Sequence, residues 1–128
     1  MTTGQHMENA YTKYWIEDDI IFIVYKDNVS FDQSTAEAIL GEIRAYHGNK
    51  RYPCLVDVSG IVAIDRPARV YMAREITHLF SRIAVVTKSF ISLAIAKFFL
   101  AVNRPSIPIN IFRDHELARR YLLAGPKD

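Results

Sequence analysis

The chain has 128 residues, of which 50% are hydrophobic and 23% are charged, with a formal net charge of +2. This length and composition are typical of one globular domain and exclude a disordered or fibrous chain. No apolar run reaches the roughly 18 residues that a membrane helix needs. The single cysteine, Cys54, provides neither an internal disulfide nor a zinc framework. Because no charged-then-apolar leader opens the chain, we expect a cytoplasmic domain. We also expect it to hold no metal and no cofactor.

The charge is unevenly distributed along the chain. Residues 1–43 carry a net charge of −6, residues 44–104 carry +7, and the remainder carries +1. Such asymmetry has two interpretations: a domain with one acidic and one basic side, or a dedicated anion-binding face.

The N-terminal part predicts a hairpin followed by a helix. Residues 1–10 are polar and aperiodic, so we expect a disordered end or a remnant of cloning. Aromatic and β-branched runs at 11–16 and 20–25 flank an acidic turn and predict two antiparallel strands. Ser30 then predicts the N-cap of a helix that ends before Gly48.

The rest of the chain alternates short apolar runs with helical periodicity. We expect strands at 54–58, 83–86 and 107–112, and helices at 66–80, 88–102 and 115–123. Pro108 places the last strand at a sheet edge. The order β-β-α-β-α-β-α-β-α predicts a single α/β domain over residues 11–125. Its sheet is expected to be mainly parallel and five-stranded, with an antiparallel N-terminal edge strand.

The run from Leu55 to Asp65, LVDVSGIVAID, resembles the signature of the STAS domain family. That family includes the SpoIIAA-like anti-sigma-factor antagonists and the cytoplasmic domains of sulfate transporters. In its signature, a strand ends in an L-D-L-S-G-like turn, apolar residues follow, and an Asp begins a helix. The predicted order of elements also matches over residues 11–123. The resemblance implies a STAS/SpoIIAA-like fold and a non-enzymatic binding or regulatory role.

One departure from the family pattern affects the expected regulation. In the antagonists, the Asp is followed by a serine that a partner kinase phosphorylates. Here Asp65 is followed by Arg66, Pro67 and Ala68, none of which has a hydroxyl group. We therefore expect an uncharacterised branch of the family without the usual phosphorylation switch.

The helix expected at 88–102 is apolar on every side, with only Ser92 and Lys97 polar between Phe90 and Val102. A surface helix needs one apolar stripe, so its outer face requires a cover. That cover is the neighbouring helices, a second copy in a homodimer, or an apolar ligand such as a lipid. The candidate residues for a dimer or ligand interface are Phe90, Ile91, Ile95, Phe98, Phe99 and Val102.

A second candidate site lies at the carboxyl edge of the predicted sheet, where ligands bind in open α/β folds. Helices begin there after Asp65 and near Ser89, and helix N-termini bind anions. The candidate anion-binding residues are Arg66, Arg69 and Lys88. Under the simpler interpretation, Asp65 is only an N-cap and the basic side chains are solvated.

No catalytic or nucleic-acid signature is present. The sequence has no G-x-S-x-G elbow, no glycine-rich phosphate loop and no clustered histidines. No recognition-helix motif accompanies the basic residues. We therefore expect no catalysis, no metal and no nucleic acid, and a homodimeric protein-interaction or regulatory domain whose partner the sequence does not identify. The alternative is a carrier or sensor of an apolar or anionic small molecule.

Overall fold

The computed structural model describes residues 5–125, so the part of the N-terminal prediction that concerns residues 1–4 lies outside it. The elements are β1 (Met7–Glu8), β2 (Thr12–Glu17), β3 (Ile20–Tyr25), β4 (Val29–Phe31), α1 (Gln33–His47), β5 (Tyr52–Asp57), β6 (Ile61–Ile64), α2 (Arg66–Leu79), β7 (Phe80–Val86), α3 (Phe90–Asn103), β8 (Ile109–Phe112) and α4 (His115–Leu123).

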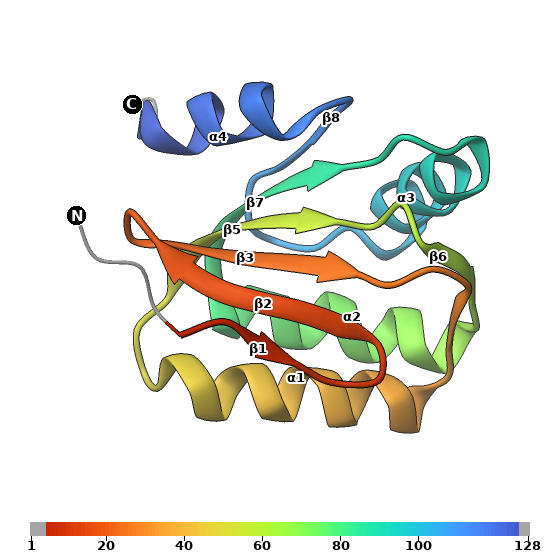
Figure 1. Cartoon of the computed structure of the whole chain (residues 1–128). Coiled ribbons are helices and arrows are strands. Elements are labelled where there is room, and N and C mark those ends of the chain that lie inside the picture. The colour runs from red at the N-terminus through yellow and green to blue at the C-terminus, as the bar shows by residue number, and fades with distance from the viewer. Residues whose placement is uncertain (1–4, 126–128) are drawn as a thin grey trace.

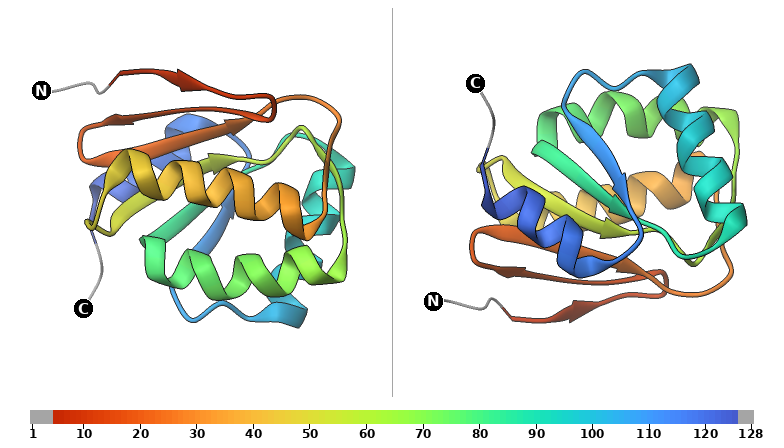
Figure 2. Two further views of the ribbon diagram at one scale, coloured as in Figure 1. Left: turned by 90° about the horizontal axis from the view of Figure 1, so that it is seen from below. Right: turned by 90° about the horizontal axis from the view of Figure 1, so that it is seen from above.

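The main sheet has the strand order β1-β2-β3-β5-β7-β8. Its first three strands pair antiparallel, and the remaining pairs are parallel. Helices α1 and α2 cover one face, α4 covers the other, and α3 lies at the end where the parallel strands finish (Figures 1 and 2). The predicted α/β class, the antiparallel edge and the edge position of the strand after Pro108 are confirmed.

The predicted count of five strands is wrong. The main sheet has six strands, and β4 and β6 form a separate two-stranded parallel sheet. The additional strand β1 pairs Met7 with Tyr14, inside the segment expected to be loose. These three strands contain two to four residues each. So short a segment carries too little periodicity to identify a strand.

The predicted N-cap of α1 is also wrong. Ser30 lies in β4, opposite Ala63 of β6, and α1 begins after Asp32. The carboxylate Oδ1 of Asp32 accepts a hydrogen bond from the N–H of Thr35 at 2.8 Å. Because Ser30 is part of β4 and pairs with β6, the cap falls two residues later, on the side chain of Asp32.

The central strands are buried on both faces. On the side of α1 and α2, Ile23 and Cys54 join the larger core, whereas Phe22 and Leu55 join a second core beneath α4. Burial on both faces explains why these strands are continuous apolar runs rather than alternating ones. Cys54 is buried in β5, and burial raises the pKa of its thiol, so it is an unreactive core residue.

His47 ends α1 and is buried against the rings of Tyr52 and Phe80. Neither ring nitrogen has a hydrogen-bond partner among the described residues. Burial is the main reason that the pKa of His47 lies below its usual value, and the nearby Arg44 acts in the same direction. Packing against these rings therefore favours the neutral form of His47.

We expect mild acid to destabilise the protein through His47. Its pKa is lower in the folded than in the unfolded state, so the unfolded state binds the proton first as the pH falls below about 6.5. Stability is then lost at up to about 1.4 kcal/mol per pH unit until the folded pKa is reached. Urea unfolding at pH 7.5, 6 and 5 should show this loss in the wild type. It should be absent in His47→Phe and retained in His78→Gln, a change at an exposed histidine. Parallel pH profiles for the two variants would contradict the assignment.

Candidate functional site

Helix α3 has three distinct sides. One side faces the core, where Ile95, Ala96 and Phe99 pack against α2 and the sheet. A second, outer side bears Ile91, Phe98 and Val102, and the side chain of Arg69 from α2 lies over the Phe98 ring. The third side, with Phe90, Leu93 and Lys97, faces β8. The apolar composition of this helix therefore reflects several different environments.

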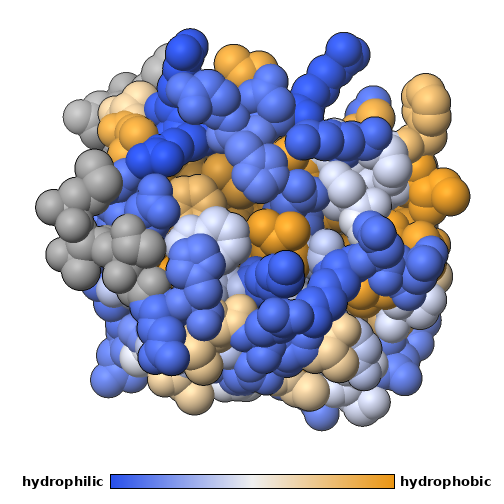
Figure 3. Space-filling view, in the orientation of Figure 1, coloured by the Kyte–Doolittle hydropathy of each residue, from blue (hydrophilic) through white to orange (hydrophobic). Residues whose placement is uncertain are grey.

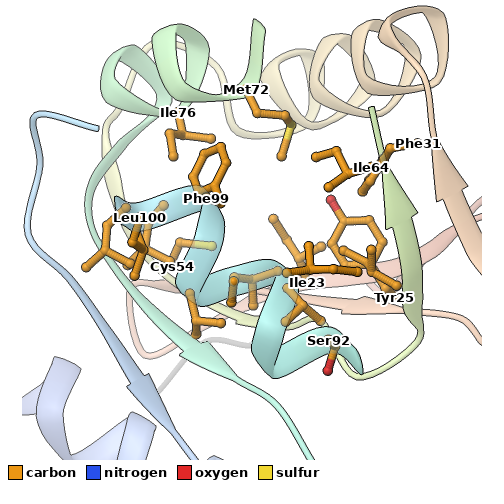
Figure 4. A pocket seen from close by; sticks show the side chains of 18 of the residues that line it. Ile23, Tyr25, Phe31, Cys54, Ile64, Met72, Ile76, Ser92, Phe99 and Leu100 are labelled. Atoms are coloured by element: carbon orange, nitrogen blue, oxygen red, sulfur yellow. The ribbon is translucent and has the colours of Figure 1, made fainter. Parts of the chain in front are cut away.

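The core side of α3 closes an apolar cavity of about 110 Å³. Figure 4 shows Phe99 and Leu100 entering it from α3, Met72 and Ile76 from α2, and Ile23 and Cys54 from the sheet. Ser92 lines one end of the cavity, and its hydroxyl group is hydrogen-bonded to the hydroxyl groups of Thr87 and Ser89. These three hydroxyl groups satisfy one another, whereas the hydroxyl group of Tyr25, which also lines the cavity, forms no hydrogen bond with another described residue.

The outer part of α3 is exposed and hydrophobic. Phe90 is 92% exposed and Phe98 is 51% exposed, and both Ile91 and Val102 are also exposed. Hydrophobic side chains gather at the right edge of Figure 3, at the end of the molecule where Figure 1 places α3. These four residues belong to the predicted interface set and lie where a second molecule can reach them.

The other two residues of that set, Ile95 and Phe99, point inward. Both line the cavity and pack against the main core. They are accessible to a ligand inside the cavity and not to a second copy of the chain. The sequence could not separate the two groups, because apolar residues occur on every side of the helix.

The predicted anion-binding residues do not form one cluster. The guanidinium of Arg69 lies 4.9 Å from the centre of the Phe98 ring, and its Nη1 donates to the carbonyl oxygen of Ile64. Arg66 is exposed at the start of α2, and Lys88 lines a groove on the β8 side of α3. Asp65 is the N-cap of α2 and accepts the N–H of Ala68 at 2.9 Å.

A carboxylate–histidine pair that the sequence analysis missed lies at the end of β5. Oδ2 of Asp57 is 2.7 Å from Nε2 of His115, and Oδ1 accepts the N–H of Ser59. Burial raises the pKa of Asp57, but the hydrogen bonds from His115 and Ser59 outweigh it, so the net pKa lies below its usual value. The only available signal was that both residues were expected near carboxyl ends of parallel strands.

The pair lacks the third member that hydrolytic chemistry requires. Within residues 5–125, no serine, threonine or cysteine is hydrogen-bonded to His115. In the same part of the chain, no group of three His, Cys, Asp or Glu side chains is placed to hold a metal ion. No helix described there is long and apolar enough to cross a membrane.

The fold defines the class of the protein. The structure matches the crystal structure of an uncharacterized protein from the DUF3478 family, with a SpoIIAA-like fold, from Shewanella loihica PV-4. The TM-score is 0.60 with 12% sequence identity, over 91% of this chain and 98% of that one. At this identity the likeness shows the fold alone, and it confirms the SpoIIAA-like, STAS-type fold expected from the Leu55–Asp65 run.

The particular family is given by the sequence. The sequence model of DUF7793, described as a domain of unknown function, matches residues 14–124. The chain therefore belongs to that family. No curated protein matches the chain.

Proposed function

We propose that this SpoIIAA-like domain is a non-catalytic interaction domain of regulatory type that forms a homodimer through the outer face of α3. The observation that carries the proposal is the exposed row of Ile91, Phe98 and Val102, with the small Ala94 between them. Their spacing of three and four residues is that of a helix–helix seam. Exposed apolar patches of this kind mark interaction surfaces.

A second copy is the partner that this face fits best. Cyclic dimers are the commonest oligomers, and a helix face can pair with itself about a two-fold axis. Stacking of Arg69 on the Phe98 ring fixes that ring in place, which lowers the entropy lost on association. Since residues 66–68 lack a hydroxyl group, the proposed association is not regulated by phosphorylation at the site used by the antagonists.

Phe98→Asp tests the proposed dimer. A charge at the centre of the seam should raise the dissociation constant roughly 30-fold or more, corresponding to a hot spot of about 2 kcal/mol. The matched control is Leu117→Asp on α4, where the replaced side chain is 48% exposed. Native mass spectrometry and sedimentation at protein concentrations of about 1–100 µM would give the mass of the wild type and of each variant. A monomeric wild type, or an equal shift in both variants, would contradict the proposal.

The second candidate function is that of a carrier of a small apolar molecule, favoured by the cavity beneath α3. Its volume of about 110 Å³ is below the roughly 150 Å³ of an engineered apolar cavity that admits benzene. The cavity therefore fits a few carbon atoms and is too small for a lipid chain unless α3 moves. In the same native spectra, a monomer with added mass would support this candidate, and a bare dimer would support the first.

A further inference from the structure

A groove of about 640 Å³ lies on the β8 side of α3, beyond the carboxyl ends of β7 and β8. Its volume falls within the range of about 300–1,000 Å³ that is typical of small-molecule sites. In open α/β sheets, ligands bind at this edge. The basic residues that line it are Lys88, Lys97 and Arg113, and its apolar walls include Phe90, Leu93 and Phe112.

The pairing of β7 with β8 brings two of the basic residues together. Val86 is the register partner of Phe112, and the N–H of Thr87 donates to the carbonyl oxygen of Phe112 at 3.1 Å. Arg113 therefore lies one residue and Lys88 two residues beyond these paired strand ends. Lys97 comes from α3, four residues after Leu93 and on the same side of the helix.

The groove concentrates positive charge without an internal counter-ion. Among the described residues, none of its three basic side chains forms an ion pair with a carboxylate. The adjacent acid, Asp114, is the N-cap of α4, and its Oδ1 accepts the N–H of Leu117. Like charges that line one concave surface repel one another, and an anion bound between them relieves that repulsion.

We propose that this groove binds a small organic anion that also carries an apolar group. The carboxylate or phosphate end is held by Lys88, Lys97 and Arg113, since an arginine fork and lysine ammonium groups both suit such oxyanions. The apolar end lies against Phe90 and the neighbouring walls of the groove. The site does not depend on the dimer proposed above, because Ile91, Phe98 and Val102 lie outside the lining of the groove.

Isothermal titration calorimetry at low ionic strength tests the site with three probes: phenyl phosphate, inorganic phosphate and phenol. Phenyl phosphate carries both features that the groove recognises, and each of the other probes carries one. We expect phenyl phosphate to bind at least about tenfold more tightly than either, because the ionic and apolar contacts act together.

Charge-reversal variants locate the binding. Lys97→Glu and Arg113→Glu should each weaken phenyl phosphate about tenfold or more. Lys13→Glu makes the same change in net charge at an exposed side chain of β2, which lies between β1 and β3 and far along the sheet from β8, and should have no effect. Phe98→Asp should also leave binding unchanged, which separates a failure of this site from a failure of the dimer.

Four outcomes would overturn the proposal: no binding of phenyl phosphate at millimolar concentration, equal loss in Lys13→Glu, equal affinity for inorganic phosphate, or binding only to a membrane. The last is tested by sedimentation with vesicles of phosphatidylcholine containing phosphatidylglycerol. Association with those vesicles but not with phenyl phosphate would identify a lipid surface as the partner instead.

Discussion

Gly60→Ala is expected to destabilise the domain by about 3 kcal/mol or more, a large part of the 5–15 kcal/mol typical of a folded domain. A β-carbon at position 60 would lie 2.0 Å from the carbonyl oxygen of Lys26, 2.6 Å from its carbonyl carbon and 3.1 Å from the Cα of Asp27. These are backbone atoms of the connection between β3 and β4, so no side-chain rotation can relieve the overlap. The carbonyl of Gly60 also accepts the N–H of Val29, which ties the two turns together.

Gly41→Ala is the matched control for this prediction. Gly41 is exposed in the middle of α1, and a β-carbon there would meet nothing within 4 Å. Alanine should therefore stabilise the protein by about 0.5–1 kcal/mol through its higher helix propensity. Chemical denaturation of both variants measures the contrast. If Gly60→Ala lost less than about 1 kcal/mol, the close approach of the two turns would be disproved.

The same glycine shows what the sequence could predict about the fold. The Ser59–Gly60 pair is a recognisable turn signal, and with the apolar run before it and Asp65 after it, it was enough to suggest the SpoIIAA-like fold. These features are local in the sequence, and local patterns of this kind are enough to predict the longer helices and strands. The contact of Gly60 with Lys26 joins residues 34 positions apart, and no local pattern encodes it.

The candidate sites also divide into features that a local sequence pattern reveals and features that depend on long-range contacts. The exposed positions of α3 could be named from its composition, but the inward turn of Ile95 and Phe99 depends on how α3 sits against α2. Lys88 was identified from its place after a strand. Lys97 and Arg113 were not identified. They lie together only because of the β7–β8 register and because Lys97 is on the side of α3 that faces β8.

Arg82→Met is expected to destabilise the domain by about 2–3 kcal/mol, because it removes charge-assisted hydrogen bonds that end α4. Arg82 is buried in β7, where its Nη1 lies 3.4 Å from the carbonyl oxygen of Tyr121 and its Nη2 donates to that of Leu122. Its guanidinium also lies over the Tyr121 ring at 5.4 Å. A cation at this end of a helix meets the negative end of the dipole. It also bonds carbonyl groups of the last turn, of which that of Leu122 accepts a further hydrogen bond from the N–H of Gly125 at 3.3 Å.

Methionine keeps most of the buried aliphatic volume, so the measured loss reports the lost donors rather than a cavity. Removal of a buried charge recovers part of its desolvation cost, which limits the effect to less than the sum of two charged hydrogen bonds. Arg120→Met is the control on the same helix, where an exposed side chain pairs with Glu116 four residues earlier and is worth at most about 0.5 kcal/mol. Urea unfolding of the two variants should differ several-fold in free energy. Equal losses would mean that the α4 terminus is held by its packing on the sheet and not by Arg82.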